Sequence, residues 1–444
     1  MKIQLSDHFT YTKLIRFTIP SILMMIFISV YSVVDGFFVA KFVGPTPFAA
    51  VNIIWPFVMI LGSVGFMLGS GGSALVAKTL GEKHKVKANR IFSLLIYVTI
   101  ICSTILAACG LLVIKPLIKS FGVEEHLLAD CMTYAYILMP AVPVLMLQII
   151  FHTFLVTAER PQFGLMITIA AGVVNFILDA FFILVLKWGL SGAAWATVIG
   201  QIVGGIIPLL YFMMPNQSLL RLGRTKLYWR ALLQACTNGV SEFLSNISMS
   251  LVGTLYNYQL LKSVGEDGVV AFGIISYVNF IFLAAFIGYA VGSNPIVSFH
   301  FGAGNKDELK NLFRRSLRLI AASGIILTLS AQLSAGWLAD CFVGYDRHLS
   351  LMTARGFRIY AVSFILAGFN IYASALFTAL NNGLVSAVIS VCRTLIFESL
   401  CVIVLPIFFG LNGIWCAIIV AEILALSISV TCWLKYKNRY GYMA

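Results

Sequence analysis

Charged side chains are scarce in this sequence: they make up 11% of its 444 residues, against about 25% in a typical soluble domain. Hydrophobic residues make up 60%. A soluble fold covers its surface largely with polar and charged groups, so this composition argues against one. The chain instead has the composition of a protein whose surface faces lipid.

Motifs of catalytic and metal sites are also missing. No H-E-x-x-H or G-x-S-x-G pattern occurs, and the nine cysteines include no C-x-x-C pair. The segment GSALVAKT (72–79) approaches the phosphate-binding loop but has Ala77 where that loop requires glycine. We therefore expect neither an enzyme nor a bound cofactor.

Long apolar stretches are what the sequence has instead. Most are about 20 residues or longer, which is enough to cross a hydrocarbon core of about 30 Å. They predict an all-α membrane protein with twelve transmembrane helices, near residues 13–40, 48–77, 91–114, 131–157, 162–186, 190–213, 231–260, 269–299, 316–338, 356–380, 384–409 and 411–434.

Basic residues gather at one end of these predicted helices. With the N-terminus in the cytoplasm, 21 of the 30 Lys and Arg residues fall on the cytoplasmic side. This is the positive-inside bias, and it predicts a multi-pass protein of the cell membrane with both termini in the cytoplasm. No single exposed domain concentrates the net charge of +13, so nucleic acid is not an expected partner.

The sequence is an internal duplication. Shifting it by 221 residues aligns its two halves without a gap, and glycines fall repeatedly on glycines, as Gly71 on Gly292 and Gly81 on Gly302. Each half has an even number of helices, so both enter the membrane in the same direction and are related by an axis along the membrane normal. We predict an N-lobe of six helices (1–213), a cytoplasmic linker (214–230) and a C-lobe of six helices (231–444).

Five segments resemble a known transporter family. They are VVDGFFVAKFVG (33–44), GSGGSALVAKTLGE (69–82), NFILDAFFI (175–183), GLSGAAWATVIGQ (189–201) and GYAVGSNPIVSFHFGAGN (288–305). In this order and spacing they resemble the multidrug and toxic compound extrusion (MATE) family. Its DinF-like and NorM-like members belong to the multidrug/oligosaccharidyl-lipid/polysaccharide flippase superfamily.

The resemblance implies antiport: drugs, toxins or metabolites leave the cell, with organic cations as the expected cargo, while H+ or Na+ enters. The coupling site for H+ or Na+ that it implies lies in the N-lobe, at Asp35, Asn175, Asp179 and Thr197. Glu242 resembles the C-lobe carboxylate of NorM-type members, although residues 356–380 lack the acid that some of them carry. We expect a monomer that binds small-molecule cargo within the bilayer.

The residues themselves also single out acids inside the predicted helices. Such an acid costs about 2.5–3.5 kcal/mol at the helix centre if it faces lipid, so it should face a cavity or a partner. At 1.5 Å per residue, Asp35, Asp179 and Thr197 all lie about 10 Å below the outer interface. Asn175 lies one turn deeper than Asp179 on the same helix face. These oxygens suit Na+ or a shared proton; the alternative is a polar contact that only holds helices together.

Three acids and one arginine lie deep in the predicted C-lobe. Glu242, Glu398 and Glu422 fall near the midplane, and Arg393 precedes Glu398 by five residues. Two interpretations stay open. These groups face a cationic substrate in the cavity, or Arg393 forms a structural ion pair with Glu398 or Glu422.

Two other functions compete with antiport. A flippase for lipid-linked oligosaccharide or cell-wall precursor would share the fold, but it should line its cavity with several Arg or Lys to hold pyrophosphate. Only Arg393 lies well inside a predicted helix. An intramembrane enzyme would need a nucleophile or a metal-ligand set beside the C-lobe acids, and the sequence offers neither.

Overall fold

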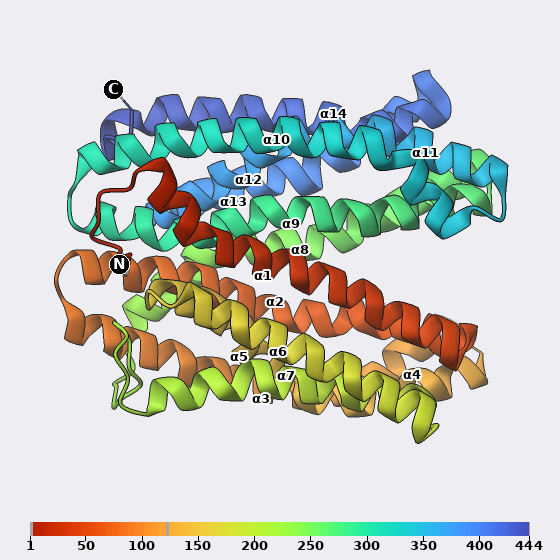
Figure 1. Ribbon diagram of the computed structural model, residues 1–444, viewed down its shortest axis with the longest axis horizontal. Coiled ribbons are helices and arrows are strands. Elements are labelled where there is room, and N and C mark those ends of the chain that lie inside the picture. Colours follow the sequence, from red (N-terminus) through yellow and green to blue (C-terminus); the bar gives the residue numbers. More distant parts are fainter. Residues whose placement is uncertain (1–2, 121–123, 444) are drawn as a thin grey trace.

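The computed structural model describes residues 3–120 and 124–443, which form a helical bundle (Figure 1). The helices of the N-lobe are α1 (Tyr11–Phe38), α2 (Pro45–Gly81), α3 (Lys85–Ser120), α4 (Glu125–Leu138), α5 (Val142–Thr157), α6 (Pro161–Asp179) and α7 (Gly189–Met213). Those of the C-lobe are α8 (Trp229–Val264), α9 (Glu266–Gly302), α10 (Lys306–Val343), α11 (Arg347–Ala361), α12 (Phe364–Ala379), α13 (Gly383–Val391) and α14 (Glu398–Tyr440).

The twelve predicted membrane helices are present. Among the described residues, nine helical stretches are long and apolar enough to span a membrane, and α11 with α12 makes a tenth that is bent by 49°. The stretch Gly383–Tyr440 has 58 residues, too many for one span, and it breaks at Gly410, where φ is 54°. The remaining helix, α8, has 36 residues and is about 54 Å long at 1.5 Å per residue. The all-α fold of two six-helix lobes is confirmed.

The two lobes meet through helix pairs that the duplication relates to each other. Helix α2 of the N-lobe packs on α8, and α9, its counterpart in the C-lobe, packs on α1. Figure 1 shows α1 and α2 beside α8 and α9 between the two lobes, with both chain ends at one end of the bundle. We call this end, where α2 meets α3 and α9 meets α10, the basic end, because it carries most of the Lys and Arg residues.

At the basic end, α2 and α9 cross at a distance that only glycine allows. A Cβ at Gly81 would collide with the carbonyl oxygen of Phe299, and a Cβ at Gly302 would collide with that of Lys78. The 221-residue offset pairs Gly81 with Gly302 and Lys78 with Phe299, so the two collisions are the same contact seen from each lobe. Backbone therefore lies against backbone, and the lobes are closed at this end.

The N-terminal segment joins the lobes at the same end. The Leu5 N–H donates to Glu159 Oε1 of the N-lobe at 2.8 Å, and the Phe9 N–H donates to Glu308 Oε1 of the C-lobe at 2.9 Å. His8 Nδ1 lies 2.5 Å from the other oxygen of Glu308. Leu5 and Phe9 are fully buried. The segment thus reinforces the closure that the glycine crossing makes.

Replacing Gly302 by alanine should destabilise the protein by about 1–3 kcal/mol, the usual cost of overpacking, because the new Cβ collides with backbone that cannot rotate away. Gly273→Ala on the same helix is the matched control, since no described atom lies within 4 Å of its added Cβ. The control should be neutral or slightly stabilising. Unfolding of purified protein in detergent measures both, and equal stability of the two variants would contradict the tight crossing.

Candidate cation-coupling site and C-lobe ion pair

Three π-helical turns interrupt the bundle, and each adjoins an ionisable residue. Helix α1 carries Asp35 in its last turn and continues as the π-helical turn Val39–Val43. Helix α6 ends at Asp179 and continues as Ala180–Val185. The third turn, Cys392–Phe397, contains Arg393 and leads directly into Glu398. π-Helical turns are rare and concentrate at functional sites, so the coincidence marks these groups as candidates.

Three of the four predicted N-lobe residues come together. The side chain of Asp35 lies beside those of Asp179 and Asn175. Asn175 and Asp179 are buried and Asp35 is half-buried. Close packing of α6 on α7 helps to hold Asn175 in position: a Cβ at Gly200 would lie only 3.1 Å from the Cβ of Asn175.

The cluster has unused hydrogen-bonding capacity. Within the described chain, Oδ1 of Asp35, Oδ1 of Asp179 and Nδ2 of Asn175 are buried without a hydrogen-bond partner. Buried polar atoms are nearly always paired, so three in one place need an explanation. Two adjacent buried carboxylates cannot both carry a charge unless a cation or a shared proton lies between them. The Asn175 amide can turn either its oxygen or its nitrogen toward such an ion.

The fourth predicted residue, Thr197, stands apart. It is buried on α7, and its hydroxyl donates to the carbonyl oxygen of Ala193 on its own helix at 3.0 Å. The described contacts include none that joins it to the two aspartates. Tyr134 of α4, by contrast, is fully buried close to both Asp35 and Asp179. The sequence gives no reason to select it, because tyrosine is common in membrane helices.

In the C-lobe, Arg393 pairs with Glu422. Its Nη2 and Nε lie 2.7 and 2.8 Å from Glu422 Oε1. The Asn370 side chain donates to Glu422 Oε2 at 2.6 Å, and the Ser429 hydroxyl donates to Asn370 Oδ1 at 2.8 Å. Glu422 is 1% exposed. Of the two sequence-based interpretations, the structure contains the ion pair for Glu422, whose carboxylate is occupied on both oxygens.

The other two C-lobe acids have no such partner. Glu398 lies near Arg393 and Tyr256, and Glu242 lies near Arg393, but neither acid forms a salt bridge among the described residues. The Tyr256 hydroxyl is buried and unpaired there as well. One of these three deep acids is thus neutralised by Arg393, and the other two have no salt bridge among the described residues.

Among the described residues, neither lobe contains a ligand set of the zinc type. No group of three or more His, Cys, Asp and Glu side chains in residues 3–120 and 124–443 is placed to hold a metal ion. The N-lobe cluster brings two carboxylates and one amide together, which suits a monovalent cation or a proton.

Breaking the buried ion pair should destabilise the C-lobe. Arg393→Gln or Glu422→Gln should each cost roughly 3 kcal/mol, because either change leaves one buried charge without its partner. The double variant should lose less than the sum of the two, since no uncompensated charge remains. Glu398→Gln is the control and should cost least. Unfolding in detergent measures the cycle, and strictly additive losses would contradict the pairing.

Comparisons with known proteins bear on this architecture. The model of the MatE family matches the chain twice, at residues 20–181 and 242–403, one match in each lobe. The multidrug export protein MepA of Staphylococcus haemolyticus is 21% identical over 432 residues, which cover 97% of this chain and 94% of MepA. An FAD transporter of Shewanella oneidensis is 23% identical over 343 residues, or 74% of each chain.

Solved structures agree on the fold. An outward-facing MATE transporter of the MOP superfamily superposes with a TM-score of 0.91 at 20% identity, over 98% of this chain and 96% of that one. The two family matches together cover well over half of the sequence. The chain therefore belongs to the MatE family of multidrug and toxin extrusion transporters.

Proposed function

We propose that this protein is a secondary antiporter that exports drugs, toxins or metabolites in exchange for inward H+ or Na+. The observation that carries the proposal is the N-lobe cluster, in which Asp35 and Asp179 lie side by side with unpaired carboxylate oxygens. A cation or proton stabilises that pair, and its loss leaves like charges together. Binding and release of the ion then favour different arrangements of the helices that carry the two acids.

The π-helical turns near the cluster support a site whose helices change conformation when the ion binds or leaves. A π-helical turn widens the helix and departs from the regular hydrogen-bond ladder, so α1 and α6 can re-form at these points with little loss. Asp179 lies directly before one such turn, and Asp35 lies four residues before the start of the other. A change of charge at the two acids can therefore change the conformation of these turns.

The C-lobe charges favour organic cations as cargo. With Arg393 held by Glu422, the deep acids Glu242 and Glu398 of the C-lobe remain without a salt bridge among the described residues. An acidic, partly dry cavity attracts cations more strongly than anions. A flippase for pyrophosphate-linked cargo would need free cations at this depth, and Arg393 is already neutralised, so antiport is the better supported function.

We assign the basic end to the cytoplasm of a cell-membrane protein, in accord with the positive-inside bias. The lobes are closed at that end. Residues 1–213 and 231–444 would move as N-lobe and C-lobe about the linker 214–230. One chain supplies both lobes and the N-lobe cluster, so we propose that a monomer suffices.

Asp35→Asn should uncouple export from the ion gradient, because it preserves shape but removes the charge that a cation or proton must meet. Purified protein in liposomes, with Na+ and pH gradients imposed separately, measures this. Gradient-driven transport should fall roughly tenfold or more, within the range of coupling energies between binding sites. Substrate binding should persist. Full gradient-driven export by well-folded Asp35→Asn protein would refute the site.

Variants of neighbouring residues sharpen that experiment. Asp179→Asn should reproduce the loss, whereas Thr197→Ala should have a smaller effect because its hydroxyl is bonded to Ala193. Glu242→Gln should lower transport of a cationic cargo more than that of a neutral one and leave the gradient response intact. Equal loss for both cargoes would speak against a substrate role for Glu242.

The orientation can be tested with single cysteines. Lys85, Lys226 and Lys310 are each replaced by cysteine in a variant without the native cysteines. These cysteines should not be labelled by impermeant thiol reagents added to intact cells. They should react once the membrane is permeabilised. Labelling of all three from outside intact cells would reverse the proposed topology.

A further inference from the structure

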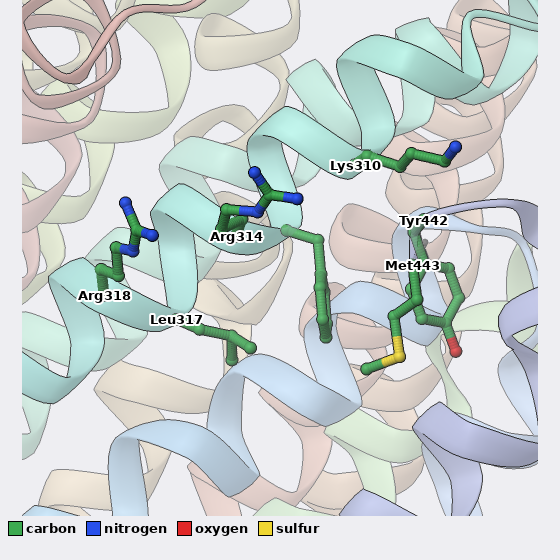
Figure 2. Close-up of a pocket in the computed structure, with 7 residues that line it drawn as sticks. Lys310, Arg314, Leu317, Arg318, Tyr442 and Met443 are labelled. Atoms are coloured by element: carbon green, nitrogen blue, oxygen red, sulfur yellow. The ribbon is translucent and has the colours of Figure 1, made fainter.

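A pocket of about 320 Å³ lies at the basic end of the C-lobe, where α10 begins. Three cations line it: Lys310, Arg314 and Arg318. They are spaced four residues apart and so occupy one face of α10 over successive turns. Figure 2 shows them projecting from that helix, with Tyr442 and Met443 of the C-terminal segment beside Lys310 and Arg314.

The three cations have no acidic partner in the described chain. The salt bridges among the described residues involve none of the three. Arg318 Nη1 donates a hydrogen bond of 3.1 Å to the Tyr11 hydroxyl. Three like charges on one face repel one another. An anion in the pocket would remove that repulsion.

The opposite wall of the pocket is apolar and well fixed. The Tyr442 hydroxyl donates to the carbonyl oxygen of Trp433 at 2.9 Å, and its ring centre lies 5.1 Å from that of Phe313. Tyr442 and Phe313 are buried. The pocket therefore joins a cationic wall to a rigid aromatic one, which suits a ligand with an anionic part and an apolar part.

The cationic face of α10 continues into a face that meets lipid. Ile325, Leu329 and Leu333 follow Arg318 at spacings of seven, four and four residues, and they are 52%, 58% and 87% exposed. Exposed aliphatic side chains in the apolar part of a membrane helix face the acyl chains. A lipid lying along this face would place its headgroup at Arg314 and Lys310.

The duplication provides an internal comparison. The 221-residue offset matches Lys310, Arg314 and Arg318 with Asn89, Ser93 and Tyr97 on α3. These neutral side chains hold the backbone of the linker. The Asn89 and Ser93 oxygens accept from the N–H groups of Arg221 and Gly223 at 2.8 and 3.0 Å, and the Tyr97 hydroxyl donates to the carbonyl oxygen of Gly223 at 3.3 Å.

The same groove is thus built in both lobes, but with different chemistry. In the N-lobe it binds a neutral peptide backbone, whereas in the C-lobe each of the three equivalent positions carries a cation. We propose that the C-lobe groove binds the headgroup of an anionic phospholipid, with the phosphate at Lys310 and Arg314 and the acyl chains along Ile325, Leu329 and Leu333. Basic pockets between membrane helices bind anionic lipid headgroups in this way.

The test compares lipid binding by three purified full-length proteins in a neutral detergent. They are the wild type, the variant Lys310→Gln/Arg314→Gln, and the charge-matched control Lys85→Gln/Lys87→Gln at the basic end of the N-lobe. Arg318 is left unchanged because it bonds to Tyr11. Native mass spectrometry measures binding of phosphatidylglycerol, cardiolipin and phosphatidylcholine, with glycerol phosphate as a soluble competitor.

Wild type and control should bind both anionic lipids with equal affinity, and the groove variant should bind them roughly tenfold more weakly or worse. Phosphatidylcholine binding should be the same for all three proteins. Melting temperatures without added lipid should also agree, which separates lost binding from lost folding. Equal affinity of the groove variant and the wild type would overturn the proposal. Displacement of the lipids by millimolar glycerol phosphate would also overturn it, in favour of a soluble phosphate ligand.

Discussion

The cost of placing a charged side chain among apolar helices governs the rest of this structure. Such a group persists only where a partner or an aqueous cavity compensates it. Glu422 is compensated by Arg393 on one oxygen and by Asn370 on the other. Asp35 and Asp179 are not: they lie together with unpaired oxygens. The first arrangement is complete within the protein, whereas the second leaves capacity for an ion or a proton, as the proposed coupling site requires.

The duplication allows equivalent positions of the two lobes to be compared. The offset of 221 residues places Tyr256 at the position of Asp35, and Glu398 lies two residues before the position equivalent to Asp179. Both lobes also have a π-helical turn in the equivalent helix, but Cys392–Phe397 lies nine residues before the position equivalent to Ala180–Val185. The lobes therefore share a π-helical turn in this helix but differ in its position and in the charged groups beside it.

The sequence predicts the depth of a side chain in the membrane better than the rotation of its helix about the helix axis. Spacing along a helix fixes depth, so Asp35, Asp179 and Asn175 could be predicted to lie at similar levels, and they do lie together. Thr197 shares that depth, but its hydroxyl turns back to its own helix. Nor could the sequence choose between Glu398 and Glu422 for Arg393, because the choice depends on how α14 faces the turn Cys392–Phe397. The long apolar stretches predict the helices themselves, since only segments of that length can cross a bilayer.

The chemistry of the basic end explains how two tightly closed lobes could still separate. Its contacts include backbone at Gly81 and Gly302, hydrogen bonds from the N–H groups of Leu5 and Phe9 to carboxylates, and the buried side chains of Leu5 and Phe9. A hydrogen bond exchanged for one with water costs a net of only about 0.5–1.5 kcal/mol. A glycine crossing exposes little apolar surface when it opens, and each 100 Å² of such surface would cost roughly 2.5 kcal/mol. The low net cost of these hydrogen bonds and the small apolar area of the glycine crossing favour a closure that can open, as the proposed alternating access requires.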